Sequence, residues 1–398
     1  MKKRMICFKT VAGILAAVMS CTTPGVVLAD TGSGAESSVA PVSDWVSGDT
    51  IEYDQLLQWI REYNPVIKSA NESYYMLAEE AMKVAERMRD EANELYDEAK
   101  DLDDIGTAEA KEASKALKKN VKELRKYAKK QQDSAENMDD STDSGRRQLN
   151  HTENTMVYNA QLLVNTYWQL EAQRAAVAKH VEAAEAALTA SQALASQGMA
   201  VESGLLASAS GLGAAKSSLT AIESGLEKVR RNIYTLTGQG YASGTKIGEI
   251  PAVDIKRIAQ IDVEKDCETA VGNNYNLITQ RHTEVEVNTN KNVNVRLRGI
   301  EEAEDQMRIT VRGLYQDVLS KKASYDAAAA NYEGAKITWN GAQIQNSQGM
   351  VNRVEFLQME AAFLESQSAY RTAELELHQA METYDWAVKG LIVSDSGQ

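Results

Sequence analysis

The tetrapeptide Ser196-Gln197-Gly198-Met199 occurs again as Ser347-Gln348-Gly349-Met350, 151 residues later. After the first copy, leucine or isoleucine recurs every seven residues at positions 205, 212, 219, 226 and 233. Positions 151 residues after these five also carry large side chains: Phe356, Phe363, Tyr370, Leu377 and Tyr384. A seven-residue repeat of apolar positions is typical of long helices that pack as coiled coils. The sequence therefore indicates a duplicated helical segment.

Similar rows precede each tetrapeptide. Apolar residues in alternating steps of four and three run from Met156 to Leu188, and the matching positions run from Met307 to Trp339. The glycine of each tetrapeptide can adopt the left-handed conformation that ends a helix. We therefore predict two antiparallel helical hairpins, over about 156–238 and 307–390, and the period near 3.5 residues predicts left-handed supercoiling.

Two charged residues interrupt these rows, Arg174 before the first turn and Lys321 before the second. Such charges can line a water-filled lumen between helices. Alternatively, they are heptad interruptions that set the register of the coiled coil. Both interpretations stay open from the sequence.

Each hairpin follows a similar opening segment. The first opening, from Ile51 to Ile67, is predicted to be helical and contains Asn64-Pro65, and the second, from Val263 to Ile278, contains Asn273-Asn274. The apolar row continues after the first opening and predicts a long helix over 67–100. The chain thus divides into repeat 1 (51–238), a linker (239–261), repeat 2 (262–390) and a tail (391–398).

Residues 107–138 are predicted to form a basic helix in repeat 1, with a narrow apolar stripe amid nine lysines and arginines between Lys111 and Lys130. This face can be solvated and balanced by nearby acidic residues. Alternatively, it contacts an anionic membrane or wall polymer.

Composition supports an all-α fold. The chain of 398 residues has four prolines and three phenylalanines, and no proline lies between Pro65 and Pro251. Long helices are therefore permitted, while the aromatic and β-branched strands of a sheet protein are missing. The net charge of −14 argues against nucleic acid as a partner.

Residues 1–29 have the pattern of a secretory signal, with basic residues, an apolar stretch and small residues up to Ala29. Residues 30–50 are predicted to be a flexible leader. A competing interpretation makes Cys21 a lipid-anchored residue after a lipobox. Nothing after residue 29 is an apolar run long enough for a transmembrane helix. We expect an exported protein of the cell envelope.

No catalytic motif stands out. The four histidines are scattered, and Cys267 has no neighbouring histidine. No HExxH pattern or other ligand spacing is present. We therefore expect no enzyme activity, no metal site and no cofactor.

The order of these motifs resembles the TolC family of outer-membrane efflux proteins. Chains of that family have two repeats, each with an Asn-Pro-containing opening and a long helical hairpin that turns at a Gly-Leu-like tip. The resemblance covers about residues 51–390 and rests on Asn64-Pro65, Asn273-Asn274, the two Gly-Met tips, Thr237-Gly238 and Lys389-Gly390. Two positions depart from it: Tyr275 replaces the second proline, and Gly204-Leu205-Leu206 replaces the acidic motif that repeat 2 keeps as Glu355-Phe356-Leu357.

In the family each repeat also inserts two membrane strands, and a spanning strand needs about 9–11 residues. Only 75 residues separate Asn274 from Gly349, and the alternating stretch from Val285 to Leu297 is too short to cross a bilayer twice. The longer first copy fills its extra length with the basic helix. We therefore expect the membrane barrel to be absent or vestigial.

The resemblance implies a homotrimer that forms a tapered helical tube. The tips, Gln197-Gly198-Met199 and Gln348-Gly349-Met350, would meet the hairpins of an adaptor (membrane fusion) protein that serves an ABC or RND pump. The alternative from another class is a non-conducting structural or adhesion coiled coil of the cell envelope. An adaptor-like protein is disfavoured because no strand-rich module is evident.

Overall fold

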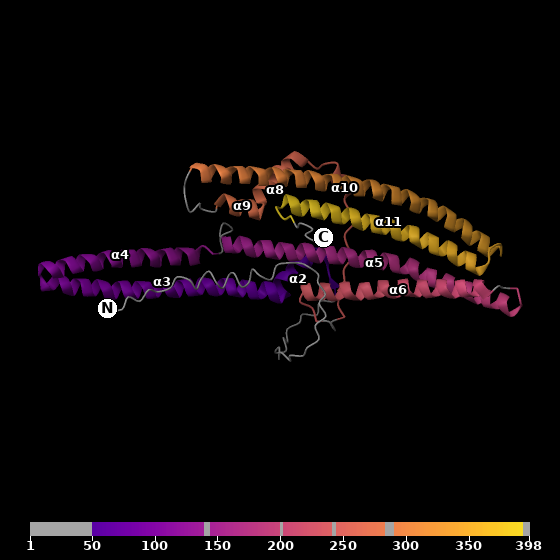
Figure 1. Ribbon diagram of the computed structural model, residues 1–398, viewed down its shortest axis with the longest axis horizontal. Coiled ribbons are helices and arrows are strands. Elements are labelled where there is room, and N and C mark those ends of the chain that lie inside the picture. The colour runs from indigo at the N-terminus through magenta and orange to yellow at the C-terminus, as the bar shows by residue number, and fades with distance from the viewer. Residues whose placement is uncertain (1–49, 139–143, 200–201, 241–243, 283–289, 393–398) are drawn as a thin grey trace. The chain divides into compact units, whose positions relative to one another are not determined.

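The computed structural model describes residues 50–138, 144–199, 202–240, 244–282 and 290–392, and Figure 1 shows their helices. Most of the described chain lies in six long helices: α3 (Pro65–Ile105), α4 (Ala108–Glu136), α5 (Ser144–Ser196), α6 (Glu202–Leu236), α10 (Asn290–Ser347) and α11 (Arg353–Val388). The expected secretory signal, leader and Cys21, and Val285 and Val287 of the alternating stretch, lie outside the described residues. The rest of that stretch, from Val293 to Leu297, is helical within α10.

The long helices pack as antiparallel pairs, α3 with α4, α5 with α6, and α10 with α11, as Figure 1 shows. Helix α5 also packs along α11, which joins the two repeats. In repeat 2 the seam is aromatic: the rings of Trp339 and Phe363 stack at 5.7 Å, and those of Tyr332 and Tyr370 at 5.4 Å. The prediction of an all-α fold built from two long hairpins is confirmed.

The pair α3–α4 packs through small side chains. On α3, Ala85, Ala92 and Ala99 recur every seven residues and are buried. On α4 the corresponding row is Ser114, Val121 and Ala128. Because these side chains are short, the two helices can approach closely. The turn between them is made by Gly106 in the left-handed conformation, with φ of 77°.

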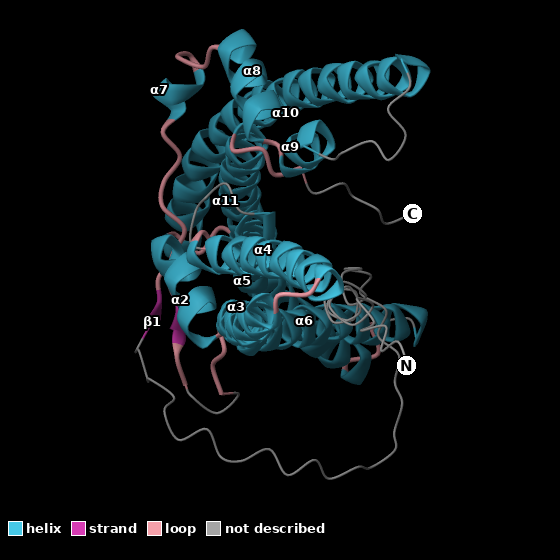
Figure 2. Cartoon of the chain, turned by 90° about the vertical axis from the view of Figure 1, so that its left-hand side faces the viewer, coloured by secondary structure: helices cyan, strands magenta, loops and turns pink. Residues whose placement is uncertain are grey.

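Short elements flank the openings of both repeats. Strand β1 (Thr50–Ile51) pairs in parallel with β2 (Lys246–Ile247), beside helix α2 (Leu56–Tyr63), as seen in Figure 2. The 3-10 helix η1 (Tyr53–Gln55) connects β1 to α2. The segment between the repeats therefore returns to the start of repeat 1.

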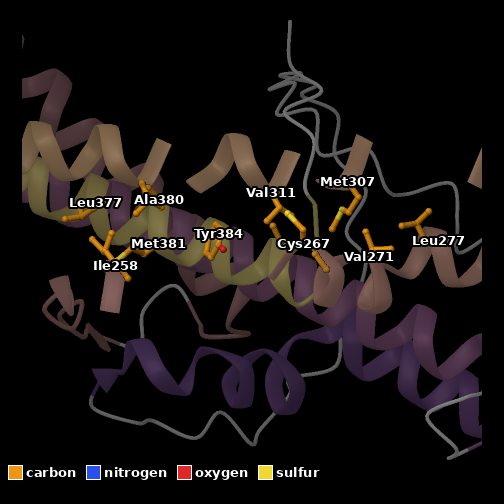
Figure 3. Close-up of a cluster of buried hydrophobic side chains, with 13 residues drawn as sticks. Ile258, Cys267, Val271, Leu277, Met307, Val311, Leu377, Ala380, Met381 and Tyr384 are labelled. Atoms are coloured by element: carbon orange, nitrogen blue, oxygen red, sulfur yellow. The ribbon is translucent and has the colours of Figure 1, made fainter. Parts of the chain in front are cut away.

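The linker ends with α7 (Ile255–Ile258), and repeat 2 opens with α8 (Val263–Asn273) and α9 (Tyr275–His282). Figure 3 shows their buried side chains gathered with those of α10 and α11. Cys267 and Val311 are fully buried in this cluster. The free thiol of Cys267 is thus part of a hydrophobic core.

An asparagine joins the opening of repeat 1 to the end of its hairpin. Asn64 Oδ1 accepts hydrogen bonds from the backbone N–H groups of Val66 and Ile67, at 2.9 and 3.1 Å, and so caps α3. Its Nδ2 donates to the carbonyl of Leu236 at 2.8 Å, at the end of α6. Pro65 occupies the first position of α3, where its missing N–H costs no hydrogen bond.

Asn274 repeats this arrangement in repeat 2. Its Oδ1 accepts from the N–H of Leu277 at 3.0 Å, and its Nδ2 donates to the carbonyl of Gly390 at 2.9 Å. The neighbouring Asn273 donates to the carbonyl of Val388 at 3.3 Å. The weaker sequence motif therefore makes the same joint without a proline.

A glycine closes each joint. Gly238 and Gly390 have φ of 67° and 90°. A Cβ atom on Gly238 would lie 2.1 Å from the carbonyl oxygen of Tyr63, and one on Gly390 would lie 2.3 Å from that of Asn273. Only glycine allows the helix end to approach the opening backbone so closely. The duplication read from the sequence is thus repeated in the contacts between backbones.

We predict that Gly238→Ala destabilises the chain far more than Gly198→Ala. Both glycines have positive φ, so both variants carry a backbone cost of about 1–2 kcal/mol. Only the first also forces a clash with Tyr63, because the space around Gly198 is open. We expect a total loss above about 3 kcal/mol for Gly238→Ala, measured by urea unfolding followed by circular dichroism. Equal losses for the two variants would contradict the close approach.

Candidate functional site

The first tip ends α5 with a tight set of backbone hydrogen bonds. Gly198, with φ of 71°, donates its N–H to the carbonyl of Ala195 at 3.0 Å. The N–H of Met199 reaches back to the carbonyl of Leu194 at 2.9 Å. This is the Schellman pattern, in which a left-handed glycine satisfies the last carbonyls of a helix.

The second tip ends α10 in the same way. Gly349, with φ of 69°, donates to Asn346 at 3.0 Å, and Met350 donates to Gln345 at 2.9 Å. Asn352 then caps α11, because its Oδ1 accepts from the N–H of Glu355 at 2.9 Å. The two tetrapeptides therefore form equivalent turns.

Both methionines point their thioethers to solvent, with Met199 66% and Met350 70% exposed. Gln197 and Gln348 beside them are exposed as well. Further large apolar residues near the tips are exposed: Leu206, the last residue of the departing motif of repeat 1, and Leu194, Ile337 and Ile344, which no sequence motif marks. Exposed apolar side chains gathered near a turn are typical of a contact surface.

A groove of about 970 Å³ lies between the two hairpins close to the tips. One wall comes from residues 182–193 of α5 and the other from residues 352–358 at the start of α11. Because both segments line one groove, the two turns lie at the same end of their hairpins. Its lining includes the small residues Ala186, Ala190 and Ala193, and its charged residues are Glu182, Glu185, Glu355 and Arg353, three acidic and one basic. Small residues in a mainly acidic lining leave room for a helix of a partner.

The two tips differ at one pair of equivalent positions. Leu206 in α6 is 71% exposed, whereas Leu357 in α11 is 7% exposed. Leu357 lies on α11, the helix that packs along α5, whereas Leu206 lies on α6, the outer helix of the first hairpin, which packs against α5. The departure from the family motif in repeat 1 thus coincides with an uncovered leucine.

The two seam charges are half-exposed and paired across their own hairpins. Arg174 approaches Glu223 of α6 at 3.8 Å and Glu171 at 3.7 Å. Lys321 donates to Glu376 of α11 at 3.0 Å. Each therefore sits at the edge of a helical pair, and the role in a lumen stays a prediction.

Polar side chains join the two repeats where α5 packs on α11. Asn165 Nδ2 donates to the carbonyl of Leu375 at 2.7 Å, and Trp386 Nε1 donates to Gln161 Oε1 at 2.6 Å. Gln161 Nε2 in turn donates to Glu382 Oε2 at 3.3 Å. Burial raises the pKa of the Glu382 carboxyl above its ordinary value, with a smaller contribution from Asp385.

The histidines take separate positions. His151 stacks on Tyr275 at 4.9 Å, and His180 Nε2 lies 2.7 Å from Glu365 Oε1. His378 is buried against Tyr53, and burial lowers the pKa of its imidazole. Within the described ranges, no three His, Cys, Asp or Glu side chains gather closely enough to hold a metal ion.

Comparisons with known proteins place this arrangement beside outer-membrane channels. No family model matches the sequence, and no curated protein matches it. Among solved structures, the CmeC outer membrane channel of Campylobacter jejuni shares 13% identity, with a TM-score of 0.43 over 66% of this chain and 68% of that one. The outer membrane protein VceC of Vibrio cholerae shares 10% identity, with a TM-score of 0.45 over 85% and 96%. CusC, whose structures concern transmembrane channel formation, shares 13% identity, with a TM-score of 0.44 over 83% and 96%.

The chain's own duplicated joints and tips carry the functional interpretation. Across the described segments, no helix combines the length and the apolar character needed to cross a membrane.

We predict that Glu382→Gln stabilises the chain near neutral pH and not in acid. A raised folded-state pKa means that folding favours the protonated carboxyl. Its stabilising contribution is therefore complete below the unfolded pKa and is lost as pH rises through the folded one. The melting temperatures of variant and wild type should agree near pH 4 and diverge towards pH 7, with the variant higher. Glu301→Gln, at an exposed position on α10, serves as the control and should show no such divergence.

Proposed function

We propose that this chain is a component of an export conduit, in which copies assemble side by side into a helical tube that accepts substrate from an adaptor and a pump. The observation that carries the proposal is the pair of equivalent Gly-Met turns, which lie at the same end of two joined hairpins and expose Met199 and Met350. Duplicated turns with a groove between them suit a partner that also presents repeated helical hairpins.

Assembly of several copies is supported by the exposed apolar residues of α10. Ile309, Ile337 and Ile344 are each more than half exposed along this helix. In a single chain these isoleucines are exposed to water, and packing against another copy would bury them. We infer three copies, as the family resemblance implies, in the envelope of the cell to which the chain is exported.

The adaptor would insert the tip of a helical hairpin into the groove between α5 and α11. Alanines along α5 leave space there, and the thioethers of the two methionines adapt to apolar partners of different shape. The mainly acidic lining favours a basic partner surface. Conduction would be passive, with energy supplied by the pump, and Arg174 and Lys321 are the charges for which we propose a position facing the lumen.

We predict that the double variant Met199→Asp/Met350→Asp weakens adaptor binding by about tenfold or more, because each aspartate places a charge where an apolar contact is expected. Binding would be measured by titrating purified residues 30–398 with the adaptor encoded nearest to this chain. The melting temperature should stay unchanged, since both methionines are exposed.

Ile105→Asp provides the matched control. Ile105 is 63% exposed and lies next to the turn at Gly106, so it has the same surroundings in a different hairpin. This variant should bind the adaptor normally. Wild-type protein that stays monomeric at every concentration, with no adaptor binding, would favour a non-conducting structural role.

A further inference from the structure

Helix α3 carries a continuous acidic stripe: Asp90, Glu94, Asp97, Asp101 and Asp104. These residues are spaced by steps of four and three, so they share one face of the helix. All five are exposed. Asp97 lies two positions from the buried Ala99, which is about 200° around the helix. The acidic stripe therefore faces away from α4.

Helix α4 carries a basic stripe of the same length: Lys115, Lys118, Lys122, Arg125 and Lys129. Its members are also exposed and also spaced by steps of three and four. Lys122 and Lys129 each follow a buried seam residue, Val121 and Ala128, by one position. The basic stripe therefore runs along a flank of α4.

Most of these charges have no partner within the described part of the chain. Lys118 pairs with Asp103, outside the acidic stripe, and Arg125 Nη2 donates to Asn93 at 3.0 Å. Across the described residues, none of the five acidic members, nor Lys115, Lys122 or Lys129, forms a hydrogen bond or an ion pair. Two rows of opposite charge thus stand on one hairpin without meeting each other.

The two stripes match in spacing when they are read in opposite directions. From Asp104 back to Asp90 the steps are three, four, three and four, and from Lys115 forward to Lys129 they are the same. Each stripe extends about 21 Å. On α3 the sign then reverses, with Arg87 and Lys83 continuing the row, and on α4 the row continues with the uncharged Gln132 and the acidic Glu136. Antiparallel helices could therefore pair these rows residue by residue.

We propose that the acidic stripe of α3 docks on the basic stripe of α4 from a second copy of this chain, so that the α3–α4 hairpins form a closed ring. This inference rests on the proposed assembly of copies. Around a symmetry axis parallel to the hairpins, each α3 lies next to the α4 of its neighbour and runs antiparallel to it. One contact repeated head to tail then closes without leaving a free stripe.

Contacts inside one chain set the expected register. Lys118 pairs with Asp103, and Arg125 contacts Asn93 and lies 5.4 Å from the ring centre of Tyr96. Neighbouring copies in such a ring lie at the same height, so the same register applies between them. This register places Lys118 of one copy opposite Asp101 of the next, and Arg125 opposite Glu94. The remaining members of the two stripes pair in the same order.

An anionic polymer or membrane is the other partner that a basic stripe could attract. The acidic stripe on the adjacent helix argues against it, because a large polyanion would meet both rows of one narrow hairpin. A second copy uses both stripes with opposite signs. The observations therefore favour another copy of the chain.

Cysteine cross-linking tests the contact directly. In a background without native cysteines, copies with Asp97→Cys are mixed with copies with Lys122→Cys, since neither residue has a partner among the described residues of its own chain. Mild oxidation should give a covalent dimer. The control mixture replaces Lys122→Cys with Lys111→Cys, which lies about 16 Å closer to the start of α4. This mixture should give no covalent dimer.

Charge reversal supplies a second measurement. Asp90→Lys/Asp97→Lys and Lys122→Glu/Lys129→Glu should each raise the dissociation constant of the oligomer by about tenfold at low salt, and by less at high salt. The chain that carries all four substitutions should regain the wild-type value, because every contact again joins opposite charges. Sedimentation velocity at matched concentrations measures these constants.

The outcomes separate this inference from the function proposed above. The hairpin contact would be overturned if the chain forms oligomers but the Asp97→Cys and Lys122→Cys copies give no covalent dimer, or if the chain with all four charge substitutions fails to assemble. Neither result would contradict the proposed conduit. A chain that never oligomerises would overturn both. Binding to anionic vesicles that the lysine substitutions abolish and the aspartate substitutions strengthen would overturn the contact in favour of a membrane partner.

Discussion

Close backbone contact between a helix end and the start of its own repeat is the constraint on which the rest of this structure depends. Gly238 lies against Tyr63, and Gly390 lies against Asn273, at distances that no Cβ atom could occupy. Because each glycine has a positive φ, the chain turns away at once after the contact. The opening helix and the hairpin of one repeat are therefore fixed relative to each other before any side chain packs between them.

The two asparagines complete that constraint with hydrogen bonds. Asn64 and Asn274 use one side-chain atom to start the following helix and another to bind the end of the hairpin. A single amide thus satisfies a backbone donor and a backbone acceptor that would otherwise be buried without partners. Repeat 2 keeps this chemistry although Tyr275 replaces the proline, so the asparagine is the essential residue of the motif and the proline is an addition.

Much of this architecture could be predicted from the sequence, because seven-residue rows and paired Gly-Met turns are local patterns. The seven-residue rows predicted the hairpins and the helices that pair within them, and the glycines of the two tetrapeptides predicted the tips. The backbone contact of Gly238 could not be predicted, since it joins residues far apart in the chain. The same holds for Glu153, which is fully buried and pairs with Arg61 at 2.8 Å. A glutamate in a polar stretch carries no local sign of burial.

The packing of α3 against α4 was less accessible to sequence reasoning for a different reason. The apolar row that predicts a helix over 67–100 includes the large residues Met88 and Leu95, yet the least exposed positions on this part of α3 are Ala92 and Ala99. Short side chains let the helices approach until the larger ones are pushed to the edges of the contact, where water still reaches them. For this reason, ranking the positions of α3 by hydrophobicity places the predicted seam slightly to one side of the buried alanines.

The polar contact between repeats shows how two similar hairpins can hold one defined position. Asn165 and Gln161 of α5 reach main-chain and side-chain groups of α11, and each bond is satisfied only at one sliding position of the helices. Apolar heptads alone would tolerate a shift by one turn, whereas buried amides would then lose their partners. Since the groove near the tips is formed by the same two helices, these amides also set its width. Burial raises the pKa of the Glu382 carboxyl, so its ionised form is unfavourable in this interface, which combines a specific register with limited stability.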